Sequence, residues 1–272
     1  MPILHAIVLG ITQGLSEFLP ISSSGHLRLV PWLFGWDDFT GHASLEKSFD
    51  VALHLGTLIG AVAYFRADVE RYLRAGFRRG ALATKDGRVA WLLVASTVPA
   101  AITGALFSDF IERKTGFVWL IAAMLVVFGL VLGWADRQPG ARTVDEVRVR
   151  DALLMGAGQA LALQPGVSRS GATMTAGRFS GLGRDGAARF AFLMSLPITA
   201  GALLFKGLDV QQSGGVPETF RAPFLWGIVA SGVTGWFAVW GTLRLIRTRT
   251  FAPFVAYRVL VGLAVLVLYT VR

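Results

Sequence analysis

The sequence contains no cysteine among its 272 residues, and only 16% of the residues are charged. The absence of cysteine excludes disulfides, thiolate metal sites and a cysteine nucleophile. The low share of charge, with 54% hydrophobic residues and a mean hydropathy of +0.58, is atypical of a soluble globular domain. Several apolar runs of about 17–20 residues are long enough to cross a bilayer. We therefore expect an all-α integral membrane protein in a lipid bilayer.

Basic residues are also absent from the beginning of the chain, where no lysine or arginine precedes Arg28. No small-residue cleavage site is apparent either, so we do not expect a typical signal peptide. The net charge is nevertheless +9, because arginines concentrate in a few segments between the apolar runs. This pattern is typical of cytoplasmic loops next to anionic lipid, and we expect no nucleic-acid partner.

Six apolar runs are predicted to span the membrane, three in each half of the chain. They are 49–65, 89–107, 117–134, 190–205, 224–243 and 251–269. Weak matches pair the two halves in order, for example Phe49 with Phe190 and Trp91 with Trp226. Ordered matches of this kind indicate an internal duplication. We predict a single membrane domain with repeat one at about 1–134, a linker at about 135–150 and repeat two at about 151–272.

Each predicted repeat contains a short polar segment rich in glycine, proline and serine. The first is QGLSEFLPISSSGH at 13–26, and the second is QALALQPGVSRSG at 159–171. At their separation of 159 − 13 = 146, Ser22, Ser24 and Gly25 align with Ser168, Ser170 and Gly171. Pro20 and the serines after it should break a helix, and the apolar stretch that follows is too short to span. We therefore expect each segment to be a re-entrant helix-turn-helix.

The distribution of basic residues distinguishes between two topologies. Basic segments lie at 66–88, 137–150 and 244–249. Six crossings with two re-entrant segments place all three on one side, which would be cytoplasmic, whereas eight crossings would separate the second from the third. We predict an inverted-topology repeat, in which each half has one re-entrant helix-turn-helix and three transmembrane helices. The two turns would then meet near the midplane, as in many transporters.

The two polar segments carry the candidate functional residues. Glu17, His26 and Arg169 are ionisable residues in a membrane-buried context, where such residues are functional candidates by default. Gln13 lies one turn before Glu17 and shares its helix face. The turns offer hydroxyls and exposed backbone N–H groups, which bind anions, and the planar fork of arginine suits phosphate oxygens. A carboxylate beside phosphate is reasonable if it holds a divalent cation or acts as a base. The combination predicts a site for phosphate chemistry.

Structural interpretations of the same residues are also open. Serine and glycine in membrane helices often only allow close packing, which would explain Ser22 or Ser170. Glu17 could be no more than the ion-pair partner of Arg169, and His26 could be an interfacial histidine. We assign no role to His54, which lies within an apolar span as a core or cavity-lining residue.

The motifs QGLSEFLPISSSGH and PGVSRSG resemble the signature motifs of the undecaprenyl-diphosphatase family of bacitracin-resistance membrane phosphatases. The resemblance extends over the length and span pattern of the chain. It implies hydrolysis of undecaprenyl diphosphate to undecaprenyl phosphate, which recycles the carrier lipid of cell-wall synthesis. It also implies a divalent cation, Mg²⁺ or Ca²⁺, and a site in the bacterial cytoplasmic (inner) membrane that opens to the extracytoplasmic side. The implied partners are the polyprenyl diphosphate lipid and the bilayer, and a homodimer is left open.

By position in these motifs, the resemblance implies catalytic roles for Glu17, Ser23, His26 and Arg169. Glu17 matches the essential acid and would also bind the metal, and Ser23 matches a proposed nucleophile or phosphate contact. His26 matches a histidine with acid, base or nucleophile roles. The family has Glu or Gln at the position of Gln13, so this chain lacks a second carboxylate there. The residues expected to contact substrate are Gln13, Ser22, Ser24, Gly25, Gly166, Ser168, Ser170 and Gly171.

Two other functions fit parts of the pattern. The Ser-Gly-His element at 24–26 and the Ser-Arg element at 168–169 resemble those of acid-phosphatase-like lipid phosphatases. That family uses a further histidine as its nucleophile, and no histidine follows His54 here. An inverted repeat also fits a transporter or flippase of a phosphorylated lipid or anion, because a fold alone does not decide function. The combination of serine, histidine, glutamate and arginine favours hydrolysis.

Overall fold

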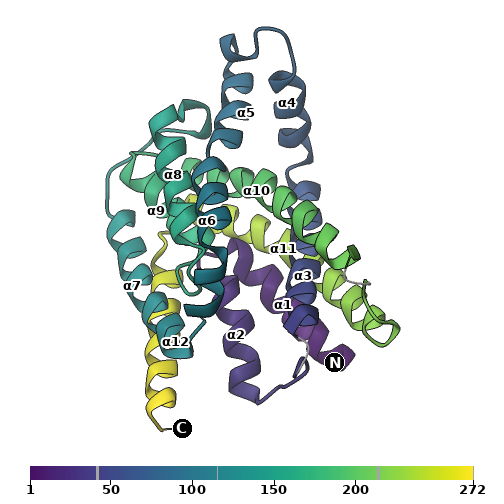
Figure 1. Cartoon of the computed structure of the whole chain (residues 1–272). Coiled ribbons are helices and arrows are strands. Elements are labelled where there is room, and N and C mark those ends of the chain that lie inside the picture. Colours follow the sequence, from purple (N-terminus) through teal and green to yellow (C-terminus); the bar gives the residue numbers. More distant parts are fainter. Residues whose placement is uncertain (41–42, 115, 213–214, 272) are drawn as a thin grey trace.

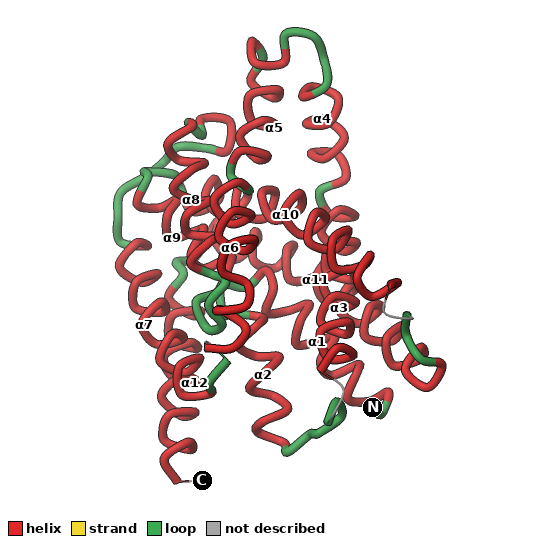
Figure 2. Tube along the Cα trace, in the orientation of Figure 1, coloured by secondary structure: helices red, strands yellow, loops and turns green. Residues whose placement is uncertain are grey.

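The computed structural model describes residues 1–40, 43–114, 116–212 and 215–271. These residues are mostly α-helical and contain no β-strand (Figures 1 and 2). The helices are α1 (Ile3–Phe18), α2 (Ser23–Phe34), α3 (Ala43–Tyr64), α4 (Arg66–Gly76), α5 (Lys85–Ala95), α6 (Val98–Lys114), α7 (Val118–Asp136), α8 (Val149–Leu161), α9 (Arg169–Phe179), α10 (Arg184–Gln212), α11 (Glu218–Thr248) and α12 (Ala252–Val271), with 3-10 turns at Ala81–Ala83 and Val144–Glu146.

The predicted all-α membrane fold is confirmed. Within the described residues, five helices are long and apolar enough to cross a membrane, and a sixth is added if α3 and α4 form one bent span. The six predicted spans correspond to α3, α5–α6, α7, α10, α11 and α12. The span predicted at 89–107 is interrupted where the hydroxyls of Ser96 and Thr97 bond to carbonyls one turn earlier. Pro99 then lies in the first turn of α6, where its missing N–H costs no helical hydrogen bond.

Both polar segments fold as helix-turn-helix hairpins, as predicted. The first hairpin is α1–α2 and the second is α8–α9. The residues that cap α2 and α9, Ser22 and Ser168, are 168 − 22 = 146 positions apart, and both have a positive φ, of 80° and 74°. Each serine oxygen accepts a hydrogen bond from the N–H three residues later, that of Gly25 or Gly171. The local geometry of the turn therefore repeats at the offset seen in the sequence.

The two hairpins lie toward opposite ends of the molecule, α1–α2 in the lower part of Figure 1 and α8–α9 in the upper part. The first hairpin packs through α1 against α11, whereas the second packs through α8 against α6 and α5. Each hairpin thus contacts the spans of the other half of the chain, while α7 packs against α12. The contact of each hairpin with helices of the other half is compatible with an inverted repeat. The repeat boundaries near 134 and 150 stay predictions.

The three basic segments meet at one end of the molecule. Asp136 at the end of α7 accepts hydrogen bonds from Arg184 at the start of α10, at 2.5 Å, and from the N–H of Phe251, at 3.0 Å. Arg189 of α10 forms an ion pair of 2.6 Å with Asp68 of α4. These contacts join the beginnings of α4, α10 and α12 to the end of α7. The basic segments therefore lie on the same side, which excludes the eight-crossing alternative.

Close contact between helices depends on glycine at two interfaces. A Cβ atom at Gly14 of α1 would lie 2.6 Å from the carbonyl oxygen of Ser231 in α11. A Cβ atom at Gly60 of α3 would lie 2.3 Å from the carbonyl oxygen of Gly232, also in α11. Small residues let membrane helices approach to backbone contact, so α11 holds α1 and α3 together through positions that tolerate no side chain.

Gly60→Ala should lower the thermal unfolding midpoint of the purified protein in detergent. The added methyl group must displace the backbone of α11, and overpacking of this kind costs about 1–3 kcal/mol. Gly241→Ala is the matched control, because a Cβ atom there meets no atom within 4 Å. Equal midpoints for the two variants would contradict the packing described for α3 and α11.

Candidate active site

The turns of the two hairpins meet inside the molecule. The hydroxyl oxygen of Ser22 accepts a hydrogen bond of 3.1 Å from the N–H of Gly166 in the opposite turn. The hydroxyl of Ser170 donates a hydrogen bond of 3.0 Å to the carbonyl of Leu19 in the first turn. The predicted meeting of the two polar segments is therefore present as direct hydrogen bonds between them.

Arg258 of α12 connects the two turns. Its side chain is completely buried, and its guanidinium donates to the carbonyl of Pro20, at 3.1 Å, and to those of Gly166 and Val167, both at 2.9 Å. It also donates to two carbonyls of α7. Irregular backbone inside a membrane needs partners for its polar groups, because no lipid can supply them. Arg258 supplies donors to both turns at once.

The carboxylate of Glu17 is buried and receives hydrogen bonds from both hairpins. Its Oε1 forms an ion pair with Arg169, while its Oε2 accepts from the Ser23 hydroxyl at 2.5 Å and from Gln13 Nε2 at 3.1 Å. Arg169 also donates to Thr199 of α10 at 2.7 Å. We call Gln13, Glu17, Ser23 and Arg169 the Glu17 cluster. The structural alternative of a Glu17–Arg169 pair is present, and the same carboxylate can accept a proton from a hydroxyl.

His26 lies apart from the Glu17 cluster. Its Nδ1 is 2.7 Å from the carbonyl oxygen of Ser22 and must carry a proton there, because a carbonyl only accepts. Its Nε2 is 2.8 Å from the hydroxyl of Tyr257. In the part of the chain that the structure describes, no hydrogen bond or ion pair joins His26 to the Glu17 cluster. The catalytic role predicted for His26 therefore requires substrate or water to replace Tyr257.

The turn N–H groups are less available than the sequence predicts. The positive φ of Ser22 and Ser168 directs their hydroxyls back onto the chain, where the oxygens accept from backbone N–H groups. The N–H groups taken up in this way are those of Gly25, Gly166 and Gly171. The expectation of exposed N–H donors is therefore wrong at these three glycines. Their roles in substrate binding stay predictions, and the hydrogen bonds give them a structural role in the turns.

The beginnings of α2 and α9 still offer donors near the Glu17 cluster. The N–H groups of Ser23 and Ser24 lie in the first turn of α2, which has no intrahelical acceptors for them. Ser24 is exposed. Because α9 begins at Arg169, both helices direct the positive ends of their dipoles toward the meeting point of the turns. This arrangement favours an anion there.

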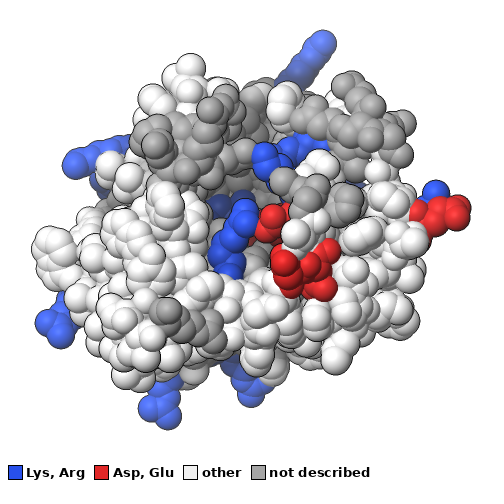
Figure 3. Space-filling model, turned by 60° about the horizontal axis from the view of Figure 1, so that its bottom comes forward, with Lys and Arg blue, Asp and Glu red and all other residues white. Residues whose placement is uncertain are grey.

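A polar face of α3 leads from the Glu17 cluster to one end of the molecule. His54 Nε2 lies 3.9 Å from Glu17 Oε2, and 34% of the His54 side chain is exposed. One turn away on α3, Asp50 is close enough to Glu46 and Lys206 to interact with them electrostatically. The lower end of the molecule is hollowed, with acidic and basic side chains around the hollow (Figure 3). The polar face of α3 thus runs toward the end opposite the basic segments.

Sequence reasoning missed Arg258, Tyr257 and Thr199, and it left His54 without a role. A signal existed for Arg258, which is an arginine inside a predicted apolar span and hence a functional candidate by default. Tyr257 and Thr199 carried no such signal, because tyrosine and threonine are ordinary in membrane helices. Only the packing of α12 and α10 against the hairpins brings them to His26 and Arg169.

The sequence of the chain is similar to those of known proteins over nearly its whole length. Residues 6–264 match a family described as "Bacitracin resistance protein BacA". A protein of Pelotomaculum thermopropionicum named "Undecaprenyl-diphosphatase" is 46% identical over 273 residues, covering 100% of this chain and 98% of that protein. Proteins of the same name from Geobacter sulfurreducens and Hahella chejuensis are 47% and 42% identical, and the alignments cover 98% and 97% of each chain.

Arg258→Met should destabilise the protein markedly, because each buried carbonyl left without its donor costs about 1–3 kcal/mol. The carbonyls of both turns would lose their donor. The thermal unfolding midpoint in detergent measures the loss. Arg249→Met, at an exposed position, removes the same charge and should leave the midpoint unchanged. A midpoint for Arg258→Met equal to that of Arg249→Met would show that the turns hold together without this residue.

Proposed function

Because the chain belongs to the bacitracin resistance protein BacA family, we propose that it is a membrane phosphatase. Its substrate is undecaprenyl diphosphate, and its products are undecaprenyl phosphate and inorganic phosphate. Relatives that align over nearly the whole chain are named undecaprenyl-diphosphatase. The reaction recycles the carrier lipid of cell-wall synthesis, and this recycling confers bacitracin resistance.

The observation that carries this proposal is the carboxylate of Glu17, shared between the hydroxyl of Ser23 and the guanidinium of Arg169. These are a proton acceptor that contacts both a nucleophile and a phosphate-binding cation. Phosphoryl transfer depends mainly on positioning and on neutralising the charge of the phosphate oxygens. Arg169 and the first turn of α2 supply this neutralisation in the proposed complex.

In the proposed reaction, Ser23 or a water molecule in its place attacks the terminal phosphorus, and Glu17 accepts the proton. The bond from that phosphorus to the bridging oxygen breaks, and undecaprenyl phosphate leaves. If Ser23 is the nucleophile, water then hydrolyses the phosphoserine, which releases phosphate and restores the hydroxyl. His26 is the proposed acid-base partner for the leaving oxygen, which takes the place of the Tyr257 hydroxyl at Nε2 in the proposed complex.

A divalent cation, Mg²⁺ or Ca²⁺, is also part of the proposal. No group of three His, Asp or Glu side chains able to hold an ion occurs among the described residues. Beside the carboxylate of Glu17, the Oε1 atom of Gln13 is buried and accepts no hydrogen bond within the described residues. Mg²⁺ commonly uses one or two protein ligands together with water and substrate phosphates. Glu17 and Gln13 thus fit a cation held jointly with the diphosphate, whose charge it would neutralise.

Purified protein in detergent should release phosphate from undecaprenyl diphosphate, and EDTA should stop the release. Glu17→Gln and Ser23→Ala should each slow it by about 10²–10⁴-fold, because each removes a group that takes part in the proton transfer. Arg169→Gln should be similarly slow. Phosphate release, followed colorimetrically at saturating substrate, measures these rates.

Ser48→Ala is the matched control and should retain the full rate, because within the described residues the Ser48 hydroxyl donates to a carbonyl of its own helix and has no other partner. Transport cannot occur in detergent, so an absence of metal-dependent phosphate release by the wild-type protein would favour the transporter or flippase alternative. Near-normal turnover by one of the variants would remove that residue from the proposed mechanism.

We propose further that the protein lies in the bacterial inner membrane with its basic end in the cytoplasm. Seven basic residues lie in segment 66–88 alone, and such segments remain cytoplasmic in most membrane proteins. The hollow in Figure 3 lies at the other end, which supports a site open to the extracytoplasmic side. A homodimer stays a prediction.

This orientation can be measured because the natural chain has no cysteine. Asp37→Cys lies at the hollowed end and Ala83→Cys at the basic end, and both positions are exposed. A membrane-impermeant maleimide applied to spheroplasts should label the first variant directly and the second only after the membrane is permeabilised. The reverse pattern would invert the proposed orientation.

A further inference from the structure

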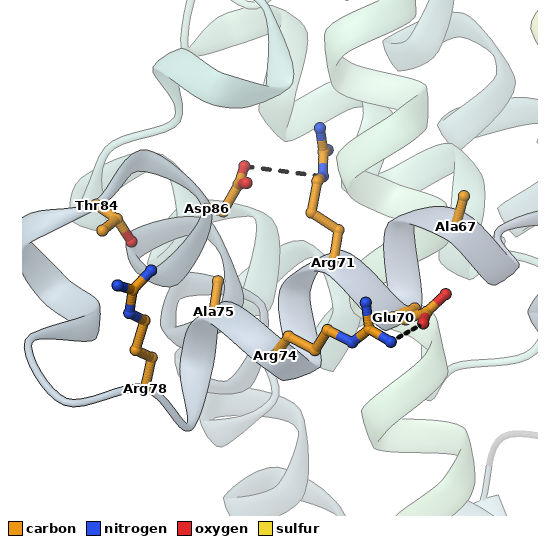
Figure 4. A pocket seen from close by; sticks show the side chains of 8 residues that line it. All are labelled: Ala67, Glu70, Arg71, Arg74, Ala75, Arg78, Thr84 and Asp86. Carbon is orange, nitrogen blue, oxygen red and sulfur yellow. Dashed lines mark ion pairs between the residues drawn. The ribbon is translucent and has the colours of Figure 1, made fainter.

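The hairpin formed by α4 and α5 contains a charged pocket that the proposed reaction does not use. It has a volume of about 470 Å³ (Figure 4), and the hairpin lies at the upper end of the molecule in Figure 1, where the basic segments meet. Its polar lining consists of Glu70, Arg71, Arg74, Arg78, Thr84 and Asp86. Pockets of this size hold small molecules or parts of larger ones.

Two of the three arginines in the pocket are paired with acidic side chains, and the third is unpaired within the described residues. Arg71 Nε lies 3.8 Å from Asp86 Oδ1, and Arg74 forms an ion pair with Glu70. Within the described residues, Arg78 has no ion pair and no side-chain hydrogen bond, and Figure 4 shows it extending toward the Thr84 side of the pocket. The pocket therefore suits a ligand with a single negative charge. A phosphodiester has that charge, and its oxygens match the guanidinium fork.

The same hairpin exposes apolar side chains beside the pocket. Phe77 is 86% exposed and Leu82 is 67% exposed. α4 is bent by 83° from α3 and lies beside α5 in a hairpin that projects from the upper end of the molecule in Figure 1. A segment with exposed basic and apolar side chains has the properties of an element at the membrane interface. With seven basic and three acidic residues, segment 66–88 has a net charge of 7 − 3 = +4, which an anionic leaflet attracts.

We propose that the α4–α5 hairpin binds an anionic phospholipid. The phosphodiester lies in the pocket at Arg78, and Phe77 and Leu82 contact the glycerol and acyl region of the same lipid leaflet. A zwitterionic lipid has the same phosphodiester, but its ammonium group is repelled by the surplus positive charge of the hairpin. The hairpin therefore selects anionic headgroups, whether or not the protein is a phosphatase.

Leu82→Cys, labelled with bimane in the otherwise cysteine-free chain, tests this proposal in nanodiscs of phosphatidylglycerol and phosphatidylcholine at fixed proportions. Bromine, which quenches bimane on contact, is carried by the acyl chains of one lipid or of the other. Quenching should be stronger when phosphatidylglycerol carries the bromine. Arg78→Gln should reduce this preference about tenfold, as expected for the loss of one charge-assisted hydrogen bond to the phosphodiester.

Arg79→Gln is the matched control, because it removes the same charge at the next position, which is exposed and outside the pocket. It should keep most of the preference, and unfolding midpoints show whether both variants are folded. Equal quenching by the two brominated lipids would overturn the proposal. If the two variants lost the same share of the preference for phosphatidylglycerol, the assignment of the lipid to the pocket would be overturned. Diffuse attraction between the basic hairpin and the anionic leaflet predicts that result. Loss of the preference on adding millimolar inorganic phosphate would identify a soluble phosphate as the ligand in place of the lipid.

Discussion

The structure depends on the hydrogen bonds that Arg258 donates to the two turns. Non-helical backbone inside a membrane cannot rely on water for its hydrogen bonds, and each hairpin places a turn of this kind within the molecule. One buried guanidinium donates to Pro20 in the first turn and to Gly166 and Val167 in the second. Because the same cation holds both, the two turns are fixed relative to each other. The contact between Glu17 and Arg169 follows from that arrangement.

The Glu17 cluster is assembled from corresponding positions of the two hairpins. Ser23 and Arg169 are 169 − 23 = 146 residues apart, the offset that relates Ser22 to Ser168, and both contact the carboxylate of Glu17. The counterpart of Glu17 at that offset is Leu163, which has no acidic group. The two turns thus share a backbone geometry while their chemistry differs, with one acid placed between a hydroxyl from one hairpin and a cation from the other. Neither hairpin contains these groups alone.

The two ends of the molecule differ in electrostatics and in shape. One end gathers the basic segments, which are joined through Asp136 and Asp68, and carries the α4–α5 hairpin. The other end is hollowed (Figure 3), and the polar face of α3 leads from there to Glu17. The proposed orientation places the hollowed end where it meets a lipid diphosphate of the outer leaflet. The basic end would face the anionic inner leaflet.

The sequence by itself determined the membrane spans, the two hairpins and most of the Glu17 cluster. Hydropathy, helix-breaking proline and the distribution of arginine act over short stretches of chain, and so does the motif that contains Glu17 and Ser23. Only the tertiary structure decided that Arg258 serves both turns, that Tyr257 faces His26, and that the hydroxyls of Ser22 and Ser168 take up N–H groups expected to be free. Contacts of this kind join residues far apart in the chain, or depend on the rare positive φ of two serines. They are set by how the helices pack, which no local pattern encodes.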